Sequence, residues 1–330
     1  MTKNVLIGTL GESPAVVTEA QDSLNDRKIT IHEVILLTTM DHDALYSLDL
    51  LMEHLPVYYN NIKNVNPITI GAYEDINSEE AVMEFMETAC DQLRDMQKRG
   101  WNVYVSIAGG RKTMSALMTL AVQIYGAKEL FHIIVEDPEL EDRSRIGNLV
   151  HCDEEEQNEM LHPDRGNITH ISMPFIGLFP WIKDIVKTLK GEKIDKKEIS
   201  ELLSSNGLME DNKPTSLGER FLDILGRVES MPDPCTEEPK ITLKKKEPKY
   251  KKKIEEMAHR LRQRFSFICE IRDTDWKKGD PKVKIERPDK LKIYFPSGGG
   301  YNLSLMLTTT AKTPGQLEKC KREVEKILER

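Results

Sequence analysis

The feature that most constrains the fold is a regular alternation of apolar runs and amphipathic segments over residues 1–150. Short apolar runs are separated by stretches whose apolar residues recur at helical spacing. Such runs occupy residues 4–10, 33–39, 67–71, 101–107 and 130–135. Strands that are apolar throughout and alternate with helices are typical of a parallel sheet covered on both faces. We therefore expect an α/β fold whose N-terminal part is a doubly wound, Rossmann-like parallel sheet.

Two further parts follow, and we expect domains at residues 1–175, 176–231 and 240–330. Residues 196–208 and 216–228 predict two short helices, which fit either a small winged helix-turn-helix unit or a plain helical linker. Pro232, Pro234 and Pro239 mark the second boundary. The last part predicts a basic helix over 250–265, three strands (267–272, 282–286, and 291–295 continuing to 301–307) and a closing helix. This order indicates an α+β domain.

The charge is divided between these parts. Residues 240–330 hold 25 Lys+Arg against 13 Asp+Glu, a net of +12, so the rest of the chain carries −20 within the total of −8. A basic part on an otherwise acidic chain is the part expected to meet a polyanion. The alternative is a well-solvated surface rich in Lys and Glu.

The cysteines and histidines favour neither a disulfide scaffold nor a metal site. The five cysteines are scattered without CxxC spacing, which suits a reducing cytoplasm. His151, Cys152, His162 and His170 fall in an acidic stretch that predicts irregular structure, and we interpret them as scattered surface residues. Glu286, Asp289, Lys290 and Lys292 do not have the spacing of a nuclease site. No apolar stretch approaches the roughly 20 residues of a membrane span.

The loop after the first predicted strand carries the first candidate site residues. It contains Thr9, Gly11, Glu12 and Ser13 and leads directly into a predicted helix. Pro14 suits the first helical position, where its missing N–H has no cost. We therefore expect Ser13 to be the N-cap residue, with its hydroxyl at the carboxyl edge of the sheet.

The loop after the fourth predicted strand has a matching position and a different chemistry. Gly109 and Gly110 allow a ligand to approach the backbone closely, and Arg111, Lys112 and Thr113 follow at the start of a helix. A cation at a helix N-terminus opposes the macrodipole, so these residues are poorly placed for stability alone. Their position indicates a bound anion.

The expected topology brings these two loops together. In a doubly wound sheet of order 3-2-1-4, strands one and four are neighbours, and a ligand crevice opens between their carboxyl ends. The loops match neither the dinucleotide G-x-G-x-x-G pattern nor the GxxxxGK[ST] of a P-loop, which argues against NAD binding and ATP hydrolysis. Each loop alone also fits a structural turn and cap, but two such loops at adjacent strand ends favour a binding pocket.

The segments TLGESPAVVTEA and SIAGGRKTMSALMTLA resemble the paired signatures of the CRISPR-associated Rossmann-fold (CARF) proteins, in the branch with the ring nucleases and the NE0113 family. The resemblance covers residues 1–175 and does not extend to the C-terminal part. It implies a homodimer that binds cyclic oligoadenylate, the second messenger made by type III CRISPR complexes. Cyclic tetra-adenylate is the expected ring.

The resemblance also implies roles for the loop residues. Ser13 and Lys112 fall on the catalytic positions of members that cut the ring, and Thr9, Gly11, Glu12, Gly109, Gly110, Arg111 and Thr113 would contact the ligand. Such cleavage needs no metal and no cofactor, because the ribose 2′-OH attacks the adjacent phosphate and leaves a 2′,3′-cyclic phosphate. The protein positions the ring and neutralises charge.

Two alternatives stay open for function. The chain could be a ligand-activated effector that acts on RNA through its basic C-terminal domain, or a transcription regulator that holds DNA with a winged helix. Lys244–Lys246, Lys251–Lys253, Arg260, Arg262 and Arg264 place nine cations within 21 residues. We predict that Lys251, Lys252, Arg260 and Arg262 lie on the open side of a helix and contact a nucleic-acid backbone.

Overall fold

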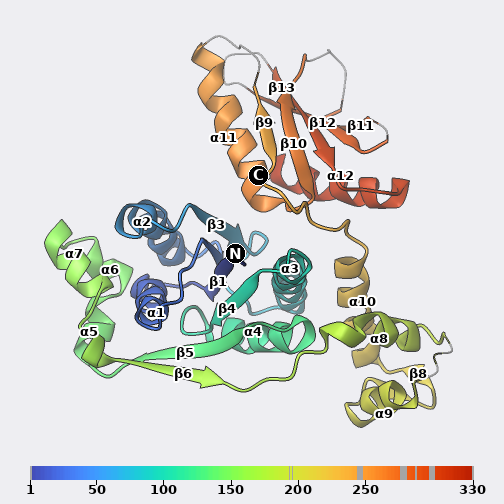
Figure 1. Cartoon of the computed structure of the whole chain (residues 1–330), viewed down its shortest axis with the longest axis horizontal. Helices are drawn as coiled ribbons and strands as arrows, with labels where there is room; N and C mark the ends of the chain where they lie inside the picture. Colours follow the sequence, from blue (N-terminus) through green and yellow to red (C-terminus); the bar gives the residue numbers. More distant parts are fainter. Residues whose placement is uncertain are drawn as a thin grey trace. The chain divides into compact units, whose positions relative to one another are not determined.

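The chain divides into two units by its internal contacts, Met1–Val228 and Glu229–Arg330 (Figure 1). A computed structural model describes residues 2–192, 194, 196–243, 248–275, 281–286, 288–296 and 302–328. The boundaries proposed from the sequence for three domains stay a prediction.

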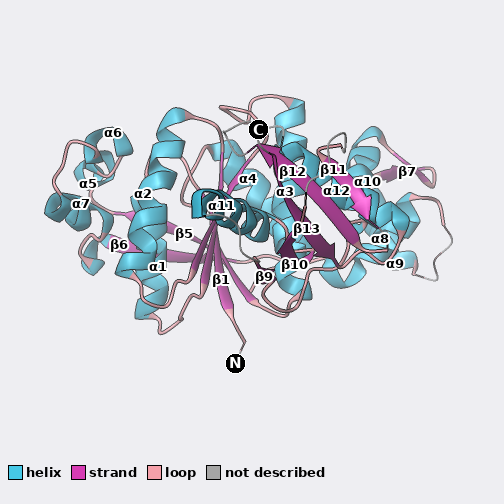
Figure 2. Ribbon diagram, turned by 90° about the horizontal axis from the view of Figure 1, so that it is seen from above, coloured by secondary structure: helices cyan, strands magenta, loops and turns pink. Residues whose placement is uncertain are grey.

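The first unit is built on a six-stranded sheet, visible as the fan of arrows in Figure 2. Its order is β3-β2-β1-β4-β5-β6, with bounds β1 Asn4–Thr9, β2 Glu33–Thr38, β3 Asn64–Thr69, β4 Asn102–Ser106, β5 Glu129–Val135 and β6 Ile168–Met173. The first five strands are parallel and β6 is antiparallel to β5. The predicted α/β fold is confirmed, and the sequence analysis missed the antiparallel edge strand β6.

Helices cover both faces of this sheet, as the strand composition predicts. Helices α1 (Ala15–Asp26) and α2 (His42–Tyr58) pack on the face that carries Leu6 and Leu36. Helices α3 (Glu79–Lys98) and α4 (Lys112–Tyr125) pack on the opposite face. Neighbouring residues of a strand point to opposite faces, and both faces are buried here, so the strands are apolar throughout.

The acidic stretch after β5 is helical, which corrects the expectation of irregular structure. It forms α5 (Pro138–Arg143), α6 (Ile146–Leu149) and α7 (Glu154–Leu161). Its acidic residues start these helices: Asp137 caps α5, and Asp153 forms a capping box with Glu156 at α7. Carboxylates at a helix N-terminus accept from free amides and complement the macrodipole. The acidic composition therefore marks helix starts rather than a loop.

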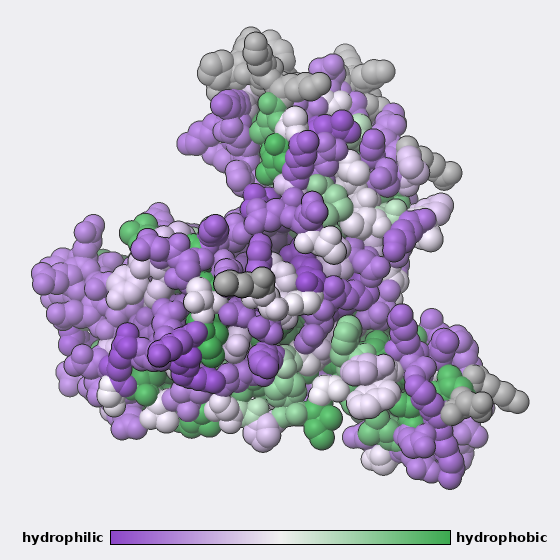
Figure 3. All heavy atoms as spheres, viewed as in Figure 1, coloured by the Kyte–Doolittle hydropathy of each residue, from purple (hydrophilic) through white to green (hydrophobic). Residues whose placement is uncertain are grey.

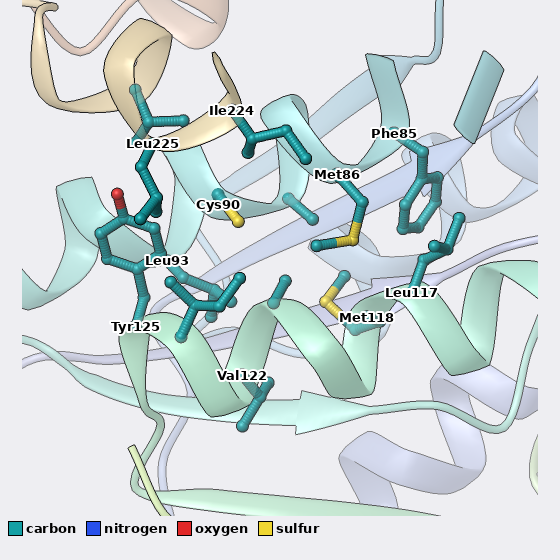
Figure 4. Close-up of a cluster of buried hydrophobic side chains, with 14 of the residues drawn as sticks. Phe85, Met86, Cys90, Leu93, Leu117, Met118, Val122, Tyr125, Ile224 and Leu225 are labelled. Atoms are coloured by element: carbon teal, nitrogen blue, oxygen red, sulfur yellow. The ribbon is translucent and has the colours of Figure 1, made fainter. Parts of the chain in front are cut away.

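Helices α8 (Ile182–Leu189), α9 (Lys197–Ser205) and α10 (Ser216–Glu229) complete this unit, with the short hairpin β7 (Met209–Glu210) and β8 (Lys213–Pro214). Figure 4 shows Ile224 and Leu225 of α10 among the side chains of α3 and α4. The turn between β7 and β8 has positive φ at Asp211 and Asn212, as two-residue hairpin turns require. The winged-helix interpretation of this region stays a prediction.

The second unit is an α+β fold, as expected. Its sheet has the order β11-β12-β13-β10-β9, and α11 and α12 pack with it. The bounds are β9 Lys240–Thr242, α11 Pro248–Arg264, β10 Ile268–Asp273, β11 Val283–Glu286, β12 Lys290–Pro296, β13 Asn302–Thr309 and α12 Pro314–Leu328. The sequence analysis treated residues 291–307 as one continuing strand, whereas β12 and β13 pair antiparallel. In the described part of the chain, no helix combines the length and apolarity needed to cross a bilayer.

Candidate ligand-binding site

The two glycine-containing loops meet at the carboxyl edge of the sheet. Strands β1 and β4 pair in parallel up to Gly8 and Ser106, so their loops leave side by side. A Cβ atom on Gly109 would lie 2.1 Å from the backbone oxygen of Thr9, and one on Gly11 would lie 3.1 Å from the Cα of Gly110. Only glycine fits such an approach of two backbones. The predicted juxtaposition of the loops is present.

The loops form one end of a cavity of about 310 Å³, called here the loop pocket. Its walls are Leu10, Gly11, Glu12, Ser13, Val16, Thr39, Asp41, Asp43, Ala44, Ala108, Gly109, Gly110, Arg111, Met114, Glu141 and Arg145. Most of the residues expected from the sequence are among them. Thr9 is buried beneath the pocket, and Lys112 and Thr113 are exposed on the first turn of α4, beside its wall.

Two of the four sheet-covering helices begin at the loop pocket without a side-chain cap. The first amides of α2 and α3 are capped by Asp41 and Ser78. In contrast, no described side chain accepts a capping hydrogen bond from the first amides of α1 and α4. Their free N–H groups and the positive end of the macrodipole suit an anion.

Ser13 is therefore not the N-cap that the sequence analysis expected. Pro14 occupies that position, and α1 begins at Ala15. The Ser13 hydroxyl instead lies 3.3 Å from the hydroxyl of Ser144, a residue that is 2% exposed. Because Ser144 donates to the backbone oxygen of Glu141 at 2.9 Å, its Oγ is left to accept from Ser13. The Ser13 side chain is thus oriented by a residue 131 positions away in the chain.

The cations of the loop pocket are paired with carboxylates. The Arg111 Nε lies 3.7 Å from an oxygen of Asp75, and the Arg145 Nη1 lies 3.4 Å from an oxygen of Glu12. All four side chains are more than a third exposed, so these pairs contribute little to stability. They are pairs that a ligand can replace.

The sequence analysis missed one wall of the pocket. Glu141 and Arg145 come from the α5–α6 segment (residues 138–149), which was expected to be irregular. Its backbone is held at the first loop by a 2.8 Å hydrogen bond from the Ile146 N–H to the Glu12 oxygen. No local signal predicts this contact. Only the capping residues Asp137 and Asp153 could have indicated that the segment is helical.

His162 is buried, which corrects its interpretation as a surface residue. Its side chain is 8% exposed, and its Nδ1 lies 2.7 Å from a carboxylate oxygen of Asp22. The Tyr59 hydroxyl donates to the other oxygen of Asp22 at 2.6 Å, and burial together with Asp22 raises the pKa of Tyr59. This network ties the end of α7 to α1 and α2.

His170 is also an anchored residue rather than a scattered one. It contacts Ser23, Arg27 and Glu129 at the amino edge of the sheet, at 2.8, 2.9 and 3.0 Å. Burial alone would raise the pKa of Glu129, but hydrogen bonds from Arg27, Ser172 and His170 hold it down at about 2. His151 is exposed and Cys152 is half-buried.

Glu19 is a buried carboxyl next to the α5–α6 segment. It is 3% exposed on α1, three residues beyond Val16 of the pocket wall. Burial, followed by the negative charges of Glu141 and Asp22, raises its pKa from an ordinary value near 4.5 to about 7. A carboxyl in this position is largely neutral below pH 7.

The described residues contain no group of three or more His, Cys, Asp or Glu side chains arranged to hold a metal ion. The four cations predicted to contact nucleic acid are on α11, where Lys251, Lys252 and Arg260 are exposed. Arg262 is 23% exposed and lies 3.4 Å from Glu238, so it is less open than expected. Lys244–Lys246 lie outside the described residues, and the contact of this surface with nucleic acid stays a prediction.

The fold was compared with solved structures and the sequence with known proteins. Among solved structures, the chain is similar to Csm6 of Enterococcus italicus bound to cyclic hexa-2′-fluoro-hexa-dAMP, with 12% identity and a TM-score of 0.38 over 69% of this chain. The chain spans 53% of the length of that protein. It is also similar to protein VC1899 of Vibrio cholerae, with 10% identity and a TM-score of 0.32, covering 93% of this chain and 77% of that one.

No curated protein matches the sequence. A family model does: residues 13–208, more than half of the chain, match that of CRISPR-associated protein NE0113. This range begins at Ser13 of the first loop and includes the second loop and the α5–α6 segment. The chain is a member of the CRISPR-associated NE0113 family.

Proposed function

We propose that the chain is an accessory protein of type III CRISPR defence that binds a cyclic oligoadenylate in the loop pocket. The observation that carries the proposal is that α1 and α4 both begin at the loop pocket without a side-chain cap. The two loops that precede these helices lie close together because they contain Gly11 and Gly109. Phosphodiesters bind free backbone amides and the positive ends of helix dipoles. Arg111 and Lys112 supply the neutralising charge at the same place, as the family resemblance implies.

The ligand-binding form is a homodimer. A ring of four phosphodiesters is two-fold symmetric, and a two-fold dimer offers it two copies of each loop. The unit has an apolar surface suited to a second copy: Leu120, Ile134, Ile171 and Ile176 are 41–77% exposed. Figure 3 shows green spheres over β5 and β6. Leu130 and Met173 pack in the same core as α4. Ile134 is four positions from Leu130 and Ile171 is two positions from Met173, so both isoleucines lie on that same face of the sheet.

The proposed reaction is a transesterification within the bound ring. The ribose 2′ oxygen forms a bond to the adjacent phosphorus, the bond from phosphorus to the 5′ oxygen breaks, and the proton of the 2′-OH ends on that leaving oxygen. The product is a linear oligoadenylate with a 2′,3′-cyclic phosphate. The Ser13 hydroxyl turns from Ser144, its partner in the free protein, and donates a hydrogen bond that orients the phosphate, while Lys112 stabilises the charge of the phosphorane.

The test is a binding and cleavage assay with labelled cyclic tetra-adenylate and cyclic hexa-adenylate, run in EDTA. We expect wild-type protein to bind and to cut one of the rings, and Lys112→Ala to lose both activities. Lys128→Ala is the matched control, because Lys128 is exposed at the opposite edge of the sheet, before β5. It should behave as wild type.

The outcomes separate the hypotheses. Binding without cleavage removes the nuclease activity and leaves a sensor, whose output is then sought in RNA cleavage or DNA binding. Full-strength binding by Lys112→Ala contradicts the assignment of the pocket. Cleavage that requires magnesium or manganese contradicts the metal-independent mechanism.

A further inference from the structure

In the free protein, the side chains that line the loop pocket carry more negative than positive charge, which does not suit a phosphate ligand. Its walls hold two guanidinium groups, of Arg111 and Arg145, against four carboxyl groups. The carboxyl groups belong to Glu12, Asp41, Asp43 and Glu141. A polyanion entering this pocket therefore requires a rearrangement of the ion pairs within it.

Arg145 is positioned for such a rearrangement. Its backbone lies at the first loop, because the next residue, Ile146, donates a 2.8 Å hydrogen bond to the Glu12 backbone oxygen. Its guanidinium lies 3.4 Å from the Glu12 carboxylate and 3.5 Å from that of Asp142. Opening the side-chain pair leaves the backbone hydrogen bond in place, so the guanidinium stays at the wall.

We infer that Arg145 is a third ligand-binding cation of the loop pocket, and that it exchanges the Glu12 carboxylate for a phosphate of the bound oligoadenylate. This inference rests on the proposed function and adds a residue from outside the two glycine loops. Arg145 acts by binding a non-reacting phosphate, while Lys112 faces the reacting one.

The exchange is favourable for physical reasons. The side chains of Arg145 and Glu12 are 49% and 54% exposed, and an ion pair that open to water is weak. A phosphate held by the helix starts can accept two parallel hydrogen bonds from the Arg145 guanidinium, whereas the present contact with Glu12 is long, at 3.4 Å. The released Glu12 carboxylate is hydrated without moving, because its side chain is already exposed to water.

The competing explanation is that Arg145 only fixes α6 to the first loop. The two roles predict a different dependence of ligand affinity on salt concentration. A phosphate-binding cation contributes to the salt dependence of affinity, whereas a structural pair does not. The experiment therefore measures dissociation constants for the cyclic oligoadenylate between about 50 and 200 mM salt.

The variants are Arg145→Ala, Glu12→Gln and the double variant, with Arg143→Ala as the control. Arg143 is an exposed arginine of the same segment that does not line the pocket. We expect Arg145→Ala to weaken binding by about 10- to 100-fold, the range for a hydrogen bond to a charged group, and to reduce the salt slope by about one. Arg143→Ala should match wild type in both respects.

Glu12→Gln should tighten binding, since it frees Arg145 and removes a negative charge. In the double-mutant cycle this gain should shrink when Arg145 is absent. An equal gain in both backgrounds means that Glu12 only repels the ligand, and overturns the exchange.

The failures are distinguishable. If wild type binds no cyclic oligoadenylate, the proposed function fails. If wild type binds, Lys112→Ala does not, and Arg145→Ala binds with wild-type affinity and salt slope, the proposed function stands and the role of Arg145 is wrong. Thermal unfolding of each variant checks that the fold is retained. The variant Arg145→Lys tests whether a positive charge alone restores the salt dependence of ligand affinity.

Discussion

The hydroxyl of Thr9 donates a 2.5 Å hydrogen bond to the backbone oxygen of Gly109, 100 residues further along the chain. This bond lies under the loop pocket, where Thr9 is 1% exposed. It joins the ends of β1 and β4 and holds the loops that follow these strands next to each other at the carboxyl edge of the sheet. The relative position of the two loops is thus determined by packing of their backbones rather than by the ligand.

Gly109→Ala should destabilise the protein and abolish ligand binding. The added Cβ would meet the Thr9 oxygen at 2.1 Å and the Val16 Cγ2 at 2.9 Å, so the loops must separate. We expect a loss of about 1–3 kcal/mol in the free energy of unfolding, measured by urea denaturation. Gly147→Ala is the control, since a Cβ there meets nothing within 4 Å. Unchanged binding by Gly109→Ala would contradict the close approach.

Ser13→Ala should lower ring cleavage more than ring binding. The hydroxyl orients one phosphate but brings no charge, so its loss affects the geometry of the reacting groups first. Ser144→Ala should have a smaller effect in the same direction, because Ser144 orients the Ser13 hydroxyl from 3.3 Å. Single-turnover cleavage and equilibrium binding are compared for each variant. Equal losses in both would make Ser13 a binding residue only.

Glu19→Gln should remove a pH dependence of stability. In wild type the folded carboxyl has a pKa of about 7 against about 4.5 in the unfolded chain, so the unfolded state releases its proton first. The contribution of this carboxyl to the free energy of unfolding is fully present below pH 4.5. It falls by on the order of 3 kcal/mol as the pH rises to 7. Unfolding of both proteins from pH 4.5 to 8 checks this, with the exposed Glu139→Gln as the control. Parallel stability curves for wild type and Glu19→Gln would contradict it.

The basic helix α11 should bind nucleic acid without sequence preference. Lys251, Lys252 and Arg260 are exposed, although Glu255 and Glu256 lie 3.8 and 3.9 Å from the two lysines and weaken the effect. We expect the full chain to retard RNA or DNA, with affinity that falls steeply between about 50 and 200 mM salt.

Replacing these three cations by alanine should weaken that binding equally for all sequences. Replacing Lys183, Lys187 and Lys190, which are exposed on or next to α8, provides the control. Absence of retardation of either nucleic acid at low salt would show that this face is solvated, and would remove the effector hypothesis.

The sequence by itself predicted the five parallel strands of the first unit, with helices on both faces, and the α+β class of the second unit. Burial of a sheet on two faces requires strands that are apolar throughout, and the packing of a helix on one face requires helical spacing, so both patterns are local. Helix α11 illustrates this, since Ile254 and Leu261, two turns apart on the helix, are both buried. The glycines of the two loops were identified from the sequence for a different reason: they were expected to admit a ligand, whereas Gly109 admits the backbone of the first loop at Thr9.

Only the tertiary structure decided which other residues complete the site. Ser144 and Arg145 reach the first loop through contacts that span more than 100 positions, and no periodicity encodes such a pairing. His162 was interpreted as a surface residue for the same reason: its burial depends on Asp22, 140 residues away. Local sequence specifies which elements form, whereas the walls of the pocket depend on how the α5–α6 segment folds back on the sheet, which is a property of the packed chain.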